Sequence, residues 1–410
     1  MLGRCSKQFH NKFKDFVKYV LKENFLSNIG AYFNTRLLSG YEIQKPIRQY
    51  AAEATVPISP PEVHCFDASI IPTEVKITKA EALELYENMV LIRRMETEIA
   101  SLYKEKKVFG FCHLYAGTEA VGAGIVANMK PVDNLITSYR CHAFAMMFQN
   151  RQKKNGPYTV MSELAGKADG VSAGKGGSMH IYVPPYFYGG QGIVGGQVPL
   201  GIGLGFGHMY SDDGGVAFAL YGDGASNQGQ VYESFNMAAL LKLPVVFVCE
   251  NNLYGMGTAA KRSSSSLEYY KASRAIPGIK ADGMDVITTR EIAKVASDYT
   301  RAGNGPILLQ FECYRYYGHS MSDPGTSYRT REEVQQVRQS RDPLNHLEAT
   351  LTDTQLATDE EIEEINKKAK KLCAEAKKAA EAAPVPNVKE LYTDLYVKYL
   401  EEPRRRTCVG

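Results

Sequence analysis

Short apolar runs alternate with helical patterns through the centre of the chain, and this alternation predicts an α/β fold. Val216 to Tyr221 forms an apolar run bounded by glycine, which is typical of a buried strand. A helical pattern follows from about Gln230 to Leu241, and Pro244 to Cys249 is a second apolar run. These three segments predict one β-α-β unit. Leu135 to Tyr139 and Pro306 to Tyr314 predict two more strands, so we expect a mostly parallel sheet flanked by helices on both faces.

Other segments predict helices around this sheet. Thr78-Lys79-Ala80-Glu81 is a capping box, which predicts the start of a long helix that continues to about Lys106. Gly117 to Met129 is rich in Gly and Ala, as expected for a tightly packed helix. Thr330 to Gln339 and Asp359 to Ala382 are polar and predict helical appendages with solvated faces.

Glycine is concentrated in residues 156–215, where three patterns bear on ligand binding. Gly170 to Gly177 differs from a phosphate-binding P-loop, which needs four residues between its glycines and Ser or Thr after its lysine. Gly192 to Gln197 favours a backbone surface against a ligand ring, although a structural turn fits its spacing equally well. The third pattern lacks the dinucleotide-binding spacing and favours a close-packed helix or a subunit seam; it comprises Gly201, Gly203, Gly205 and Gly207.

The ends of two predicted strands carry the strongest chemical signal. Asp223 follows the first strand and Asn252 follows the second. Open parallel sheets bind ligands at the carboxyl ends of their strands, so we expect these side chains to converge. Their oxygens, with a carbonyl from the following loop, suit Mg²⁺, which completes its coordination with substrate phosphates. Gly222 and Gly224 allow close approach of a phosphate, and the helix start after Asn227 adds N–H donors.

The spacing of these residues is more specific than each motif alone. Gly-Asp-Gly by itself is also common turn chemistry. Gly-Asp-Gly followed, 29 positions after its aspartate, by the second Asn of an Asn-Asn pair resembles the cofactor motif of the thiamine-diphosphate fold. The sequence therefore predicts a site for a magnesium-bound diphosphate.

Composition separates the first 50 residues from the rest of the 410-residue chain. They hold nine Lys or Arg residues and three Asp or Glu residues, with apolar residues at helical spacing, a pattern typical of a mitochondrial transit peptide. A basic amphipathic arm that contacts a membrane surface or a partner is the alternative. We expect cleavage between Arg36 and Ala52. Because the remaining chain is slightly acidic, its charge gives no reason to expect nucleic-acid binding.

The whole composition, 44% apolar and 23% charged, is that of a soluble globular protein, and no stretch approaches the roughly 20 apolar residues of a membrane span. After the leader we expect a Pro-rich, irregular linker or arm over 51–77, a cofactor-binding domain over 78–383 and a C-terminal appendage over 384–410. Eight cysteines without a CxxC pair suggest no metal site and fit a reducing compartment such as the mitochondrial matrix.

Seven segments together resemble the alpha subunits of thiamine-diphosphate-dependent 2-oxo acid dehydrogenases, in particular those of the mitochondrial pyruvate dehydrogenase decarboxylating component. The resemblance covers about residues 75–405. The segments are GFCHLYAGTEA (110–120), TSYRCH (137–142), GKGGSMHIY (174–182), GGQGIVGGQVPLG (189–201), LYGDGASNQGQ (220–230), CENNLYGMGT (249–258) and YRYYGHSMSDPGTSYR (314–329).

This resemblance implies the thiamine-diphosphate-binding fold and the oxidative decarboxylation of pyruvate. It further implies reductive acetyl transfer to the lipoyl group of dihydrolipoyl acetyltransferase, which feeds acetyl-CoA formation. The implied cofactors are thiamine diphosphate and Mg²⁺. The implied assembly has two alpha and two beta subunits, with the cofactor bound across each alpha–beta interface. Because the carboxylate that activates the aminopyrimidine lies on the beta subunit in this family, the alpha chain alone is expected to be inactive.

The resemblance also implies roles for individual residues. Asp223, Asn252 and the Tyr254 carbonyl would bind Mg²⁺, and His319 would be a catalytic proton donor or orienting group at the reacting centre. Arg suits a diphosphate because its planar guanidinium can bind phosphate in a bidentate way. The other implied cofactor-binding or pocket-lining residues are Phe111, His113, Tyr139, Arg140, Gly192, Val194, Gly224, Ala225 and Met256.

In this family the segment equivalent to 319–329 is the target of a dedicated kinase, opposed by a phosphatase. Ser320 and Ser327 match two phosphorylated positions, and a phosphate on Ser320 would add about two negative charges beside the implied catalytic histidine. Two positions depart from the family pattern. Ala259 stands where animal relatives carry a third phosphorylatable Ser, and Tyr317 stands where many relatives have His.

Two alternative functions remain open. An alpha subunit of a branched-chain 2-oxo acid dehydrogenase would share the cofactor and the mechanism, but ENNLYGMGT and GHSMSDPG are of the pyruvate type. A non-catalytic scaffold of the same fold is disfavoured by the intact Asp223, Asn252, Arg140 and His319.

Overall fold

The computed structural model describes residues 51–395. The predicted transit peptide, residues 1–50, and the end of the predicted C-terminal appendage, residues 396–410, lie outside the described residues. No helix between residues 51 and 395 is long and apolar enough to cross a membrane.

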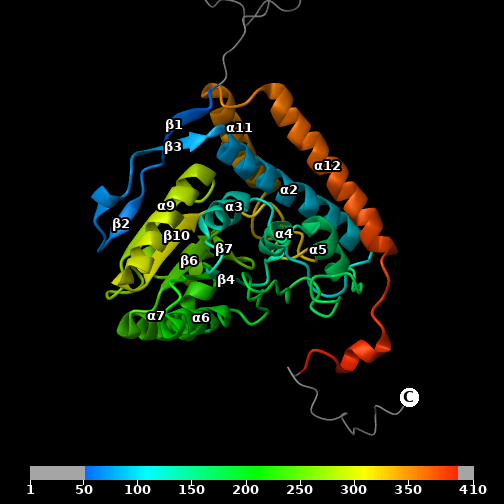
Figure 1. The fold of residues 1–410 in the computed structure, drawn as a ribbon, viewed down its shortest axis with the longest axis horizontal. Coiled ribbons are helices and arrows are strands. Elements are labelled where there is room, and N and C mark those ends of the chain that lie inside the picture. Colours follow the sequence, from blue (N-terminus) through cyan, green and yellow to red (C-terminus); the bar gives the residue numbers. More distant parts are fainter. Residues whose placement is uncertain (1–50, 396–410) are drawn as a thin grey trace, which may run out of the picture. The chain divides into compact units, whose positions relative to one another are not determined.

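A six-stranded sheet forms the centre of the described chain (Figure 1). Its strand order is β2-β9-β10-β6-β5-β4, and every neighbouring pair is parallel except β2 with β9. The strands are β2 (Glu62–His64), β4 (Asn134–Ile136), β5 (Ala217–Gly222), β6 (Val245–Asn251), β9 (Gly278–Asp282) and β10 (Ile307–Glu312). The mostly parallel sheet expected from the alternation of apolar runs and helical patterns is confirmed.

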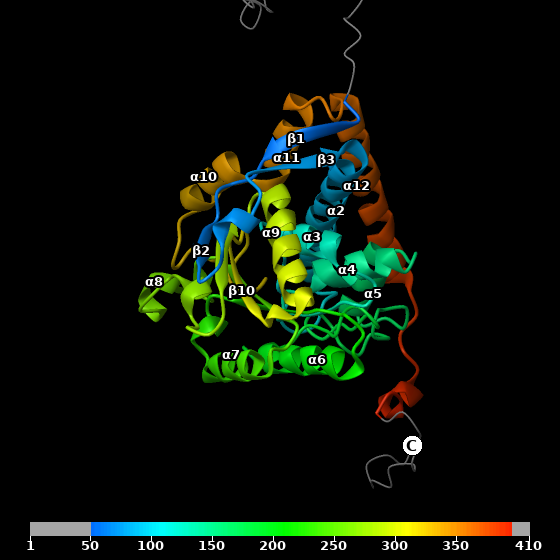
Figure 2. The ribbon, with the colours of Figure 1, turned by 60° about the vertical axis from the view of Figure 1, so that its left-hand side comes forward.

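The continuous apolar sequences of the central strands follow from burial on both faces of the sheet. Phe218 and Leu220 of β5 enter a core that lies on one face, whereas Ala219 and Tyr221 enter a second core on the other. The first core lies beneath α2 (Lys79–Lys104), α3 (Glu119–Asn128) and α9 (Val286–Tyr299). The second lies beneath α6 (Gln197–Ser211) and α7 (Gly229–Leu241), at the opposite side of the sheet in Figure 2.

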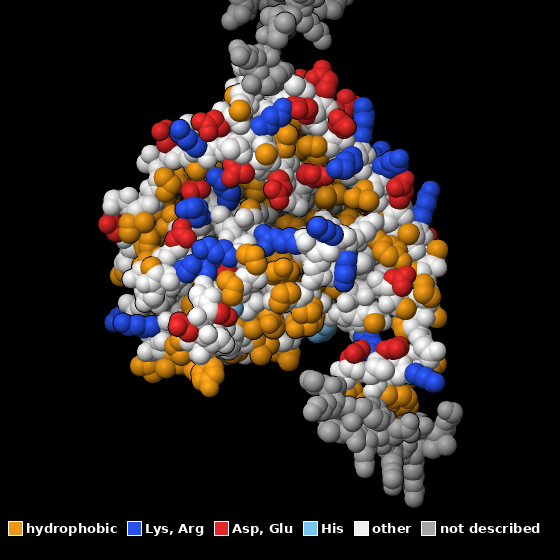
Figure 3. Space-filling view, in the orientation of Figure 1, with side chains coloured by type: hydrophobic (Ala, Val, Ile, Leu, Met, Phe, Trp, Pro, Cys, Tyr) orange, Lys and Arg blue, Asp and Glu red, His pale blue; other side chains and the backbone are white. Residues whose placement is uncertain are grey.

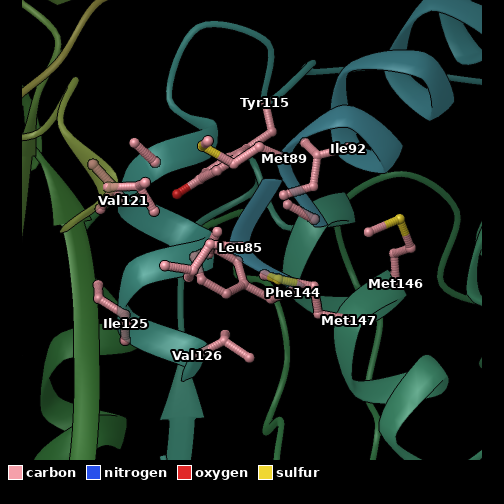
Figure 4. Close-up of a cluster of buried hydrophobic side chains, with 14 of the residues drawn as sticks. Leu85, Met89, Ile92, Tyr115, Val121, Ile125, Val126, Phe144, Met146 and Met147 are labelled. Atoms are coloured by element: carbon pink, nitrogen blue, oxygen red, sulfur yellow. The ribbon is translucent and has the colours of Figure 1, made fainter. Parts of the chain in front are cut away.

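The larger core is organised around α3, which is buried over most of its length (Figure 4). Val121 and Ile125 of this helix pack with Leu85 and Met89 of α2 and with Phe144 of the following helix, α4 (His142–Arg151). Gly and Ala residues in α3 make this position possible, as the tight-packing prediction required. On the other side of α2 packs the long helix α12 (Asp359–Ala382), which also packs against α5 (Gly156–Leu164).

The alternating glycines of α6 serve the packing of that helix on the sheet. A methyl group on Gly201 would lie 2.5 Å from the Ala219 Cβ, and one on Gly205 would lie 2.3 Å from a Val245 methyl. A methyl group on Gly203 or on Gly207 would have no other atom within 4 Å. The predicted close-packed helix is therefore confirmed, while the alternative role as a subunit seam stays a prediction.

Strand β4 is shorter than predicted. It ends at Ile136, which lies opposite Ala219 and is the last residue of the strand paired with β5. Tyr139 and Arg140 consequently lie in the loop that follows β4, and not at the strand end.

The expectation of an irregular segment over 51–77 is wrong. β1 (Glu53–Pro57) and β3 (Glu74–Thr78) pair in antiparallel fashion, and β2 joins the edge of the central sheet. Prolines occur at strand ends here, where they remove no ladder hydrogen bond: Pro57 closes β1, and Pro61 immediately precedes β2. The capping box at Thr78 and Glu81 is confirmed at the start of α2.

Smaller elements complete the described chain. A helix that had not been predicted follows Asp342, directly after α10. The remaining elements are β7 (Tyr254–Gly255), β8 (Thr258–Ala259), α8 (Ala260–Ser263), α10 (Arg331–Arg341), α11 (Pro343–Asp353) and the helical turns η1 (Ala68–Ile70), η2 (Ala225–Asn227), η3 (Tyr269–Lys271), η4 (Thr300–Asn304) and η5 (Val388–Tyr392).

Candidate cofactor site

A pocket of about 390 Å³ lies at the carboxyl ends of β5 and β6, where the sequence places the diphosphate site. Loops after β4, β5, β6 and β10 converge on it, together with the segment that precedes α6. Ten of the predicted site residues line this pocket: Tyr139, Arg140, Val194, Asp223, Gly224, Ala225, Asn252, Tyr254, Met256 and His319.

The floor of the pocket carries an unpaired acid. Asp223 is 1% exposed, and its Oδ2 has no hydrogen-bond partner among the described residues. Burial raises the pKa of Asp223 to about 6. A buried carboxylate is costly unless a proton or a cation compensates its charge. This end of the pocket therefore fits a cation.

Two further oxygens beside this acid complete a donor set suited to Mg²⁺. Arg315 Nη1 donates to Asn252 Oδ1 at 3.4 Å and to the Tyr254 carbonyl oxygen at 3.2 Å. Carboxylate, amide and carbonyl oxygens are the hard ligands that Mg²⁺ prefers. Between residues 51 and 395 no cluster of three His, Cys, Asp or Glu side chains could hold a metal. The donor set described here differs from such a cluster, because Asp223 is its only residue of these four types.

Two glycines of the pocket allow a close approach of its backbone segments. Gly224 and Gly255 face each other, because a methyl group on Gly224 would lie 3.1 Å from the Gly255 Cα. η2 begins at Ala225, directly after this glycine, and α7 begins four residues later. The predicted helix start after Asn227 is thus divided into a turn and a helix, whose free N–H groups favour an anion.

Arg140 supplies positive charge to the wall of the pocket. The side chain is buried, and its guanidinium donates to the Leu114 carbonyl at 2.5 Å and to the His319 carbonyl at 3.0 Å. These carbonyls fix the guanidinium between two loops while it still lines the pocket. A cation held this way is suited to a diphosphate.

A cluster of rings stands beside Arg140. The His319 ring lies 5.0 Å from the His113 ring and 5.4 Å from the Tyr139 ring, centre to centre. Burial and the charges of Arg140 and Arg315 lower the pKa of His319 to about 4. Burial also holds the pKa of His113 well below its usual range. Both imidazoles are therefore neutral near pH 7, and each can donate one hydrogen bond and accept one.

Three predicted residues do not line this pocket. His113 lies behind its wall, in contact with the rings of Tyr139 and His319. Phe111 is largely exposed and lies 6.2 Å from the His113 ring. Gly192 lies against the His180 ring, where a methyl group would come within 3.0 Å of Nε2.

Two charged residues that line the pocket were not predicted from the sequence. Arg315 belongs to the matched YRYYGHS run and lies three residues after the end of β10, and Glu250 immediately precedes the Asn-Asn pair. Glu250 accepts a hydrogen bond from the Tyr115 hydroxyl at 2.5 Å, and burial raises the pKa of Glu250 to about 7. Their positions at or near strand ends were the available signal. The contacts that bring them to the pocket, from Arg315 to Asn252 and Tyr254 and from Glu250 to Tyr115, span long stretches of sequence, so no local pattern indicates them.

The glycine-rich segment 170–177 wraps around a protein carboxylate. Glu163 at the end of α5 is fully buried, and its two carboxylate oxygens accept four backbone N–H groups at 2.7 to 3.1 Å. The donors are Ser172, Gly174, Gly176 and Gly177. Because these amides are already satisfied, the segment has none of them to offer a phosphate, in agreement with its departure from the P-loop pattern.

The segment 315–329 closes the pocket next to His319. The Asp323 carboxylate accepts the His319 and Gly325 N–H groups and the Tyr328 hydroxyl. Burial alone would raise the pKa of Asp323, but these hydrogen bonds outweigh it and hold the pKa below its usual range. Ser320 is 5% exposed in this arrangement, and its hydroxyl pairs with that of Ser322 at 2.9 Å. Ser327 is exposed.

Fold and pocket together define an α/β protein with a pocket at the carboxyl edge of its sheet, whose lining fits a cation and a diphosphate. The chain belongs to the dehydrogenase E1 component family, which matches it over residues 87–389 and is thiamine-diphosphate dependent. It is 50% identical over 356 residues to the Saccharomyces cerevisiae protein named pyruvate dehydrogenase E1 component subunit alpha, mitochondrial, with 86% of this chain and 83% of that protein covered.

Two further relatives carry the same printed name. The Kluyveromyces lactis protein is 52% identical over 331 residues, which cover 80% of this chain and 79% of the relative. The Sminthopsis macroura protein is 46% identical over 349 residues, which cover 85% of this chain and 94% of the relative.

Proposed function

We propose that this chain is the alpha subunit of a mitochondrial pyruvate dehydrogenase. With a beta subunit it catalyses the oxidative decarboxylation of pyruvate and transfers the acetyl group to the lipoyl domain of dihydrolipoyl acetyltransferase. The observation that carries the proposal is the 50% identity with the yeast alpha subunit over 86% of this chain. The pocket at β5 and β6 supports it, because the acid, the amide and the guanidinium that the chemistry needs line one cavity. The relatives are named as mitochondrial, and we place this chain in the matrix.

In this proposal the chain binds and orients the cofactor. Asp223, Asn252 and the Tyr254 carbonyl hold Mg²⁺, which neutralises the unpaired carboxylate. Arg140 and the backbone at Gly224 and Ala225 bind the diphosphate, and Val194 presents its backbone to the aminopyrimidine. When bound, thiamine diphosphate supplies the carbon nucleophile and the electron sink. Arg315 donates to two of these proposed ligand oxygens, at Asn252 and Tyr254, so Mg²⁺ would share them with a guanidinium.

His319 is the group of this chain assigned to the reacting centre. Its neutral imidazole lines the pocket, and Nδ1 has no hydrogen-bond partner among the described residues. The backbone of His319 is held at both sides, since Asp323 accepts its N–H and Arg140 donates to its carbonyl. The ring is therefore positioned to exchange a proton or a hydrogen bond with substrate.

The beta subunit covers an apolar surface in this proposal. Exposed hydrophobic side chains gather where α6 and α7 lie, along the lower edge in Figure 3. Large exposed apolar patches mark interaction surfaces. Residues of this surface are Leu200, Phe206, Met209, Tyr210, Tyr232, Met237, Leu240 and Leu241. We propose an assembly of two alpha and two beta subunits, in which the beta subunit completes the cofactor site.

A kinase and a phosphatase act on the segment 315–329 in the proposed complex, at Ser320 and Ser327. The two serines differ in access, because Ser320 is buried and Ser327 is exposed. Phosphorylation of Ser320 therefore requires the segment to open first, and the phosphate then opposes reclosure because a buried charge without a partner is costly.

The test is co-expression of residues from about 52 onward with a matched beta subunit. Decarboxylation is measured with pyruvate and separately with a branched-chain 2-oxo acid, each with and without thiamine diphosphate and Mg²⁺. We expect cofactor-dependent turnover of pyruvate, its loss in Asp223→Ala and its retention in the exposed control Asp353→Ala. A preference for the branched substrate would overturn the pyruvate assignment, and a folded heterotetramer without turnover would indicate a scaffold. Turnover by the alpha chain alone would contradict the requirement for the beta subunit.

A further inference from the structure

A second cavity of about 390 Å³ lies behind the segment 315–329 and shares no lining residue with the cofactor pocket. Arg315 and His319 face the cofactor pocket, whereas the intervening residues and Ser320 line the second cavity. The end of α2 and the start of α10 form its other walls. Its volume lies within the range of small-molecule sites, about 300 to 1,000 Å³.

The lining of this cavity is cationic. Lys104, Arg329 and Arg331 line it, against one acid, Asp323. The Asp323 carboxylate is directed into the segment itself, where three donors engage it. Its charge is therefore largely compensated from within the segment.

Two of the three cations have no partner in the part of the chain that the structure describes. Lys104 ends α2 and Arg331 begins α10; both are exposed, and neither forms a hydrogen bond or ion pair within residues 51–395. Arg329 is buried, and its guanidinium donates to the carbonyls of Arg315 and Tyr317. Two unpaired cations at one cavity, with a buried third behind them, favour an anion.

The remaining walls indicate what kind of anion fits. Tyr316, Tyr317, Met321 and Val334 line the cavity with apolar surface. A ligand with an apolar body and one phosphate or carboxylate group would satisfy both kinds of wall, whereas a bare inorganic ion would use only the cations.

The segment between the two cavities is too tightly folded for its faces to move independently. A methyl group on Gly318 would lie 1.9 Å from the Asp323 carbonyl oxygen, so the chain closes on itself here. The Met321 N–H also donates to the Cys112 carbonyl, which joins the segment to the wall that holds His113. A ligand that restrains one face therefore restrains His319 on the other.

We propose that this second cavity is an effector site for a small organic anion, a phosphate monoester or a carboxylate, whose binding holds the segment 315–329 closed. Binding itself goes beyond the proposed function; only its effect on the cofactor pocket rests on that function. Ser320 lines the same cavity, and a phosphate esterified to it would have the chemistry of a phosphate monoester. We assign the site to a free anion and not to that phosphate.

The test uses the alpha–beta heterotetramer, unphosphorylated and saturated with thiamine diphosphate and Mg²⁺ so that the cofactor pocket is filled. Phenyl phosphate is titrated by calorimetry, with inorganic phosphate as the comparison. Wild type should bind phenyl phosphate more tightly than inorganic phosphate. Lys104→Ala/Arg331→Ala should bind it about ten-fold more weakly, as expected for two lost charge contacts. The matched control Lys370→Ala/Lys378→Ala removes two exposed cations from α12 and should leave the affinity unchanged.

A second readout follows closure of the segment. Phenyl phosphate should slow chymotryptic cleavage at Tyr316, Tyr317 and Tyr328 in wild type and in Ser320→Ala, but not in Lys104→Ala/Arg331→Ala. Equal affinity of the double variant and wild type would overturn the proposal, as would the absence of calorimetric binding in the cofactor-saturated heterotetramer. Loss of binding in Ser320→Ala would also overturn it, because the site would then depend on the serine. Failure of the proposed function would appear instead as absent turnover with binding intact.

Discussion

Two segments of this protein are held in place by buried charged groups, but the sets of charges differ. The segment 170–177 surrounds the Glu163 carboxylate with backbone N–H groups. The segment 315–329 surrounds guanidinium groups, because Arg315 donates to the carbonyls of Tyr317, Tyr254 and Met256, and Arg329 to those of Arg315 and Tyr317. The first segment is therefore closed around one carboxylate from α5, whereas the second is held by its own two guanidinium groups together with the Asp323 carboxylate.

The two segments differ in whether their hydrogen-bond partners also belong to the cofactor pocket. All four donors to Glu163 belong to the segment it anchors, and no residue of 170–177 lines the cofactor pocket. Arg315, in contrast, donates to Asn252 and Tyr254, which we assign to the metal. The first segment therefore keeps its structure whether or not the pocket is filled. The second shares two acceptor oxygens with the proposed metal ligands, so we expect its order to be coupled to the site.

The largest expected effect comes from removing the Glu163 carboxylate. Glu163→Gln replaces a carboxylate oxygen by an NH₂ group that faces backbone N–H donors, leaving about two of them unsatisfied. Each costs about 1 to 3 kcal/mol, so we expect a loss of roughly 4 kcal/mol in the free energy of unfolding. Urea unfolding of the heterotetramer measures it, with the exposed Glu364→Gln on α12 as control. A change below about 1 kcal/mol would mean that the carboxylate does not anchor the segment.

Next in size is the effect of a charge at Ser320. Ser320→Glu places a carboxylate at a position that is 5% exposed beside His319, and burial of an unpaired charge costs several kcal/mol, so the segment should open. We expect at least about a hundred-fold lower turnover in the heterotetramer. Ser327→Glu, at an exposed position of the same segment, should cost less than about ten-fold. Equal losses in the two variants would contradict the link between burial and inhibition.

The sequence predicts the strand ends of the cofactor pocket better than the contacts that close these two segments, for a physical reason. Asp223, Asn252 and the strands that carry them could be predicted because strand periodicity and the parallel-sheet rule are local signals. The anchoring role of Glu163 was missed, because the donors begin nine residues later and no periodic pattern links them. Arg315 was missed for the same reason, since it meets Asn252 across 63 positions of sequence. Contacts that close loops depend on the finished fold.

A smaller effect separates the two segments directly. Arg315→Gln removes the cation that ties 315–329 to residues 252–256, so amide hydrogen exchange of 316–329 should accelerate by about ten-fold without cofactor. Exchange of 170–177 should stay unchanged. Glu163→Gln should give the reverse pattern. If either variant accelerates exchange in both segments, the two are one cooperative unit and the contrast between them is wrong.

The last prediction concerns the protons that compete with the metal. Because Asp223 has a pKa of about 6, protonation should oppose Mg²⁺ as the pH falls below 6, and affinity should drop by up to about ten-fold per pH unit there. Above pH 7 affinity should level off.

Glu250, with a pKa of about 7, lines the same pocket and is the other candidate for this dependence. Titration of Mg²⁺ at fixed thiamine diphosphate, from pH 5 to 8, separates the two: Glu250→Gln should keep the dependence, and Asp223→Asn should bind weakly at every pH. A flat profile in Glu250→Gln would assign the proton to Glu250 instead, and would mean that Arg315 already compensates the charge of Asp223 before the metal arrives.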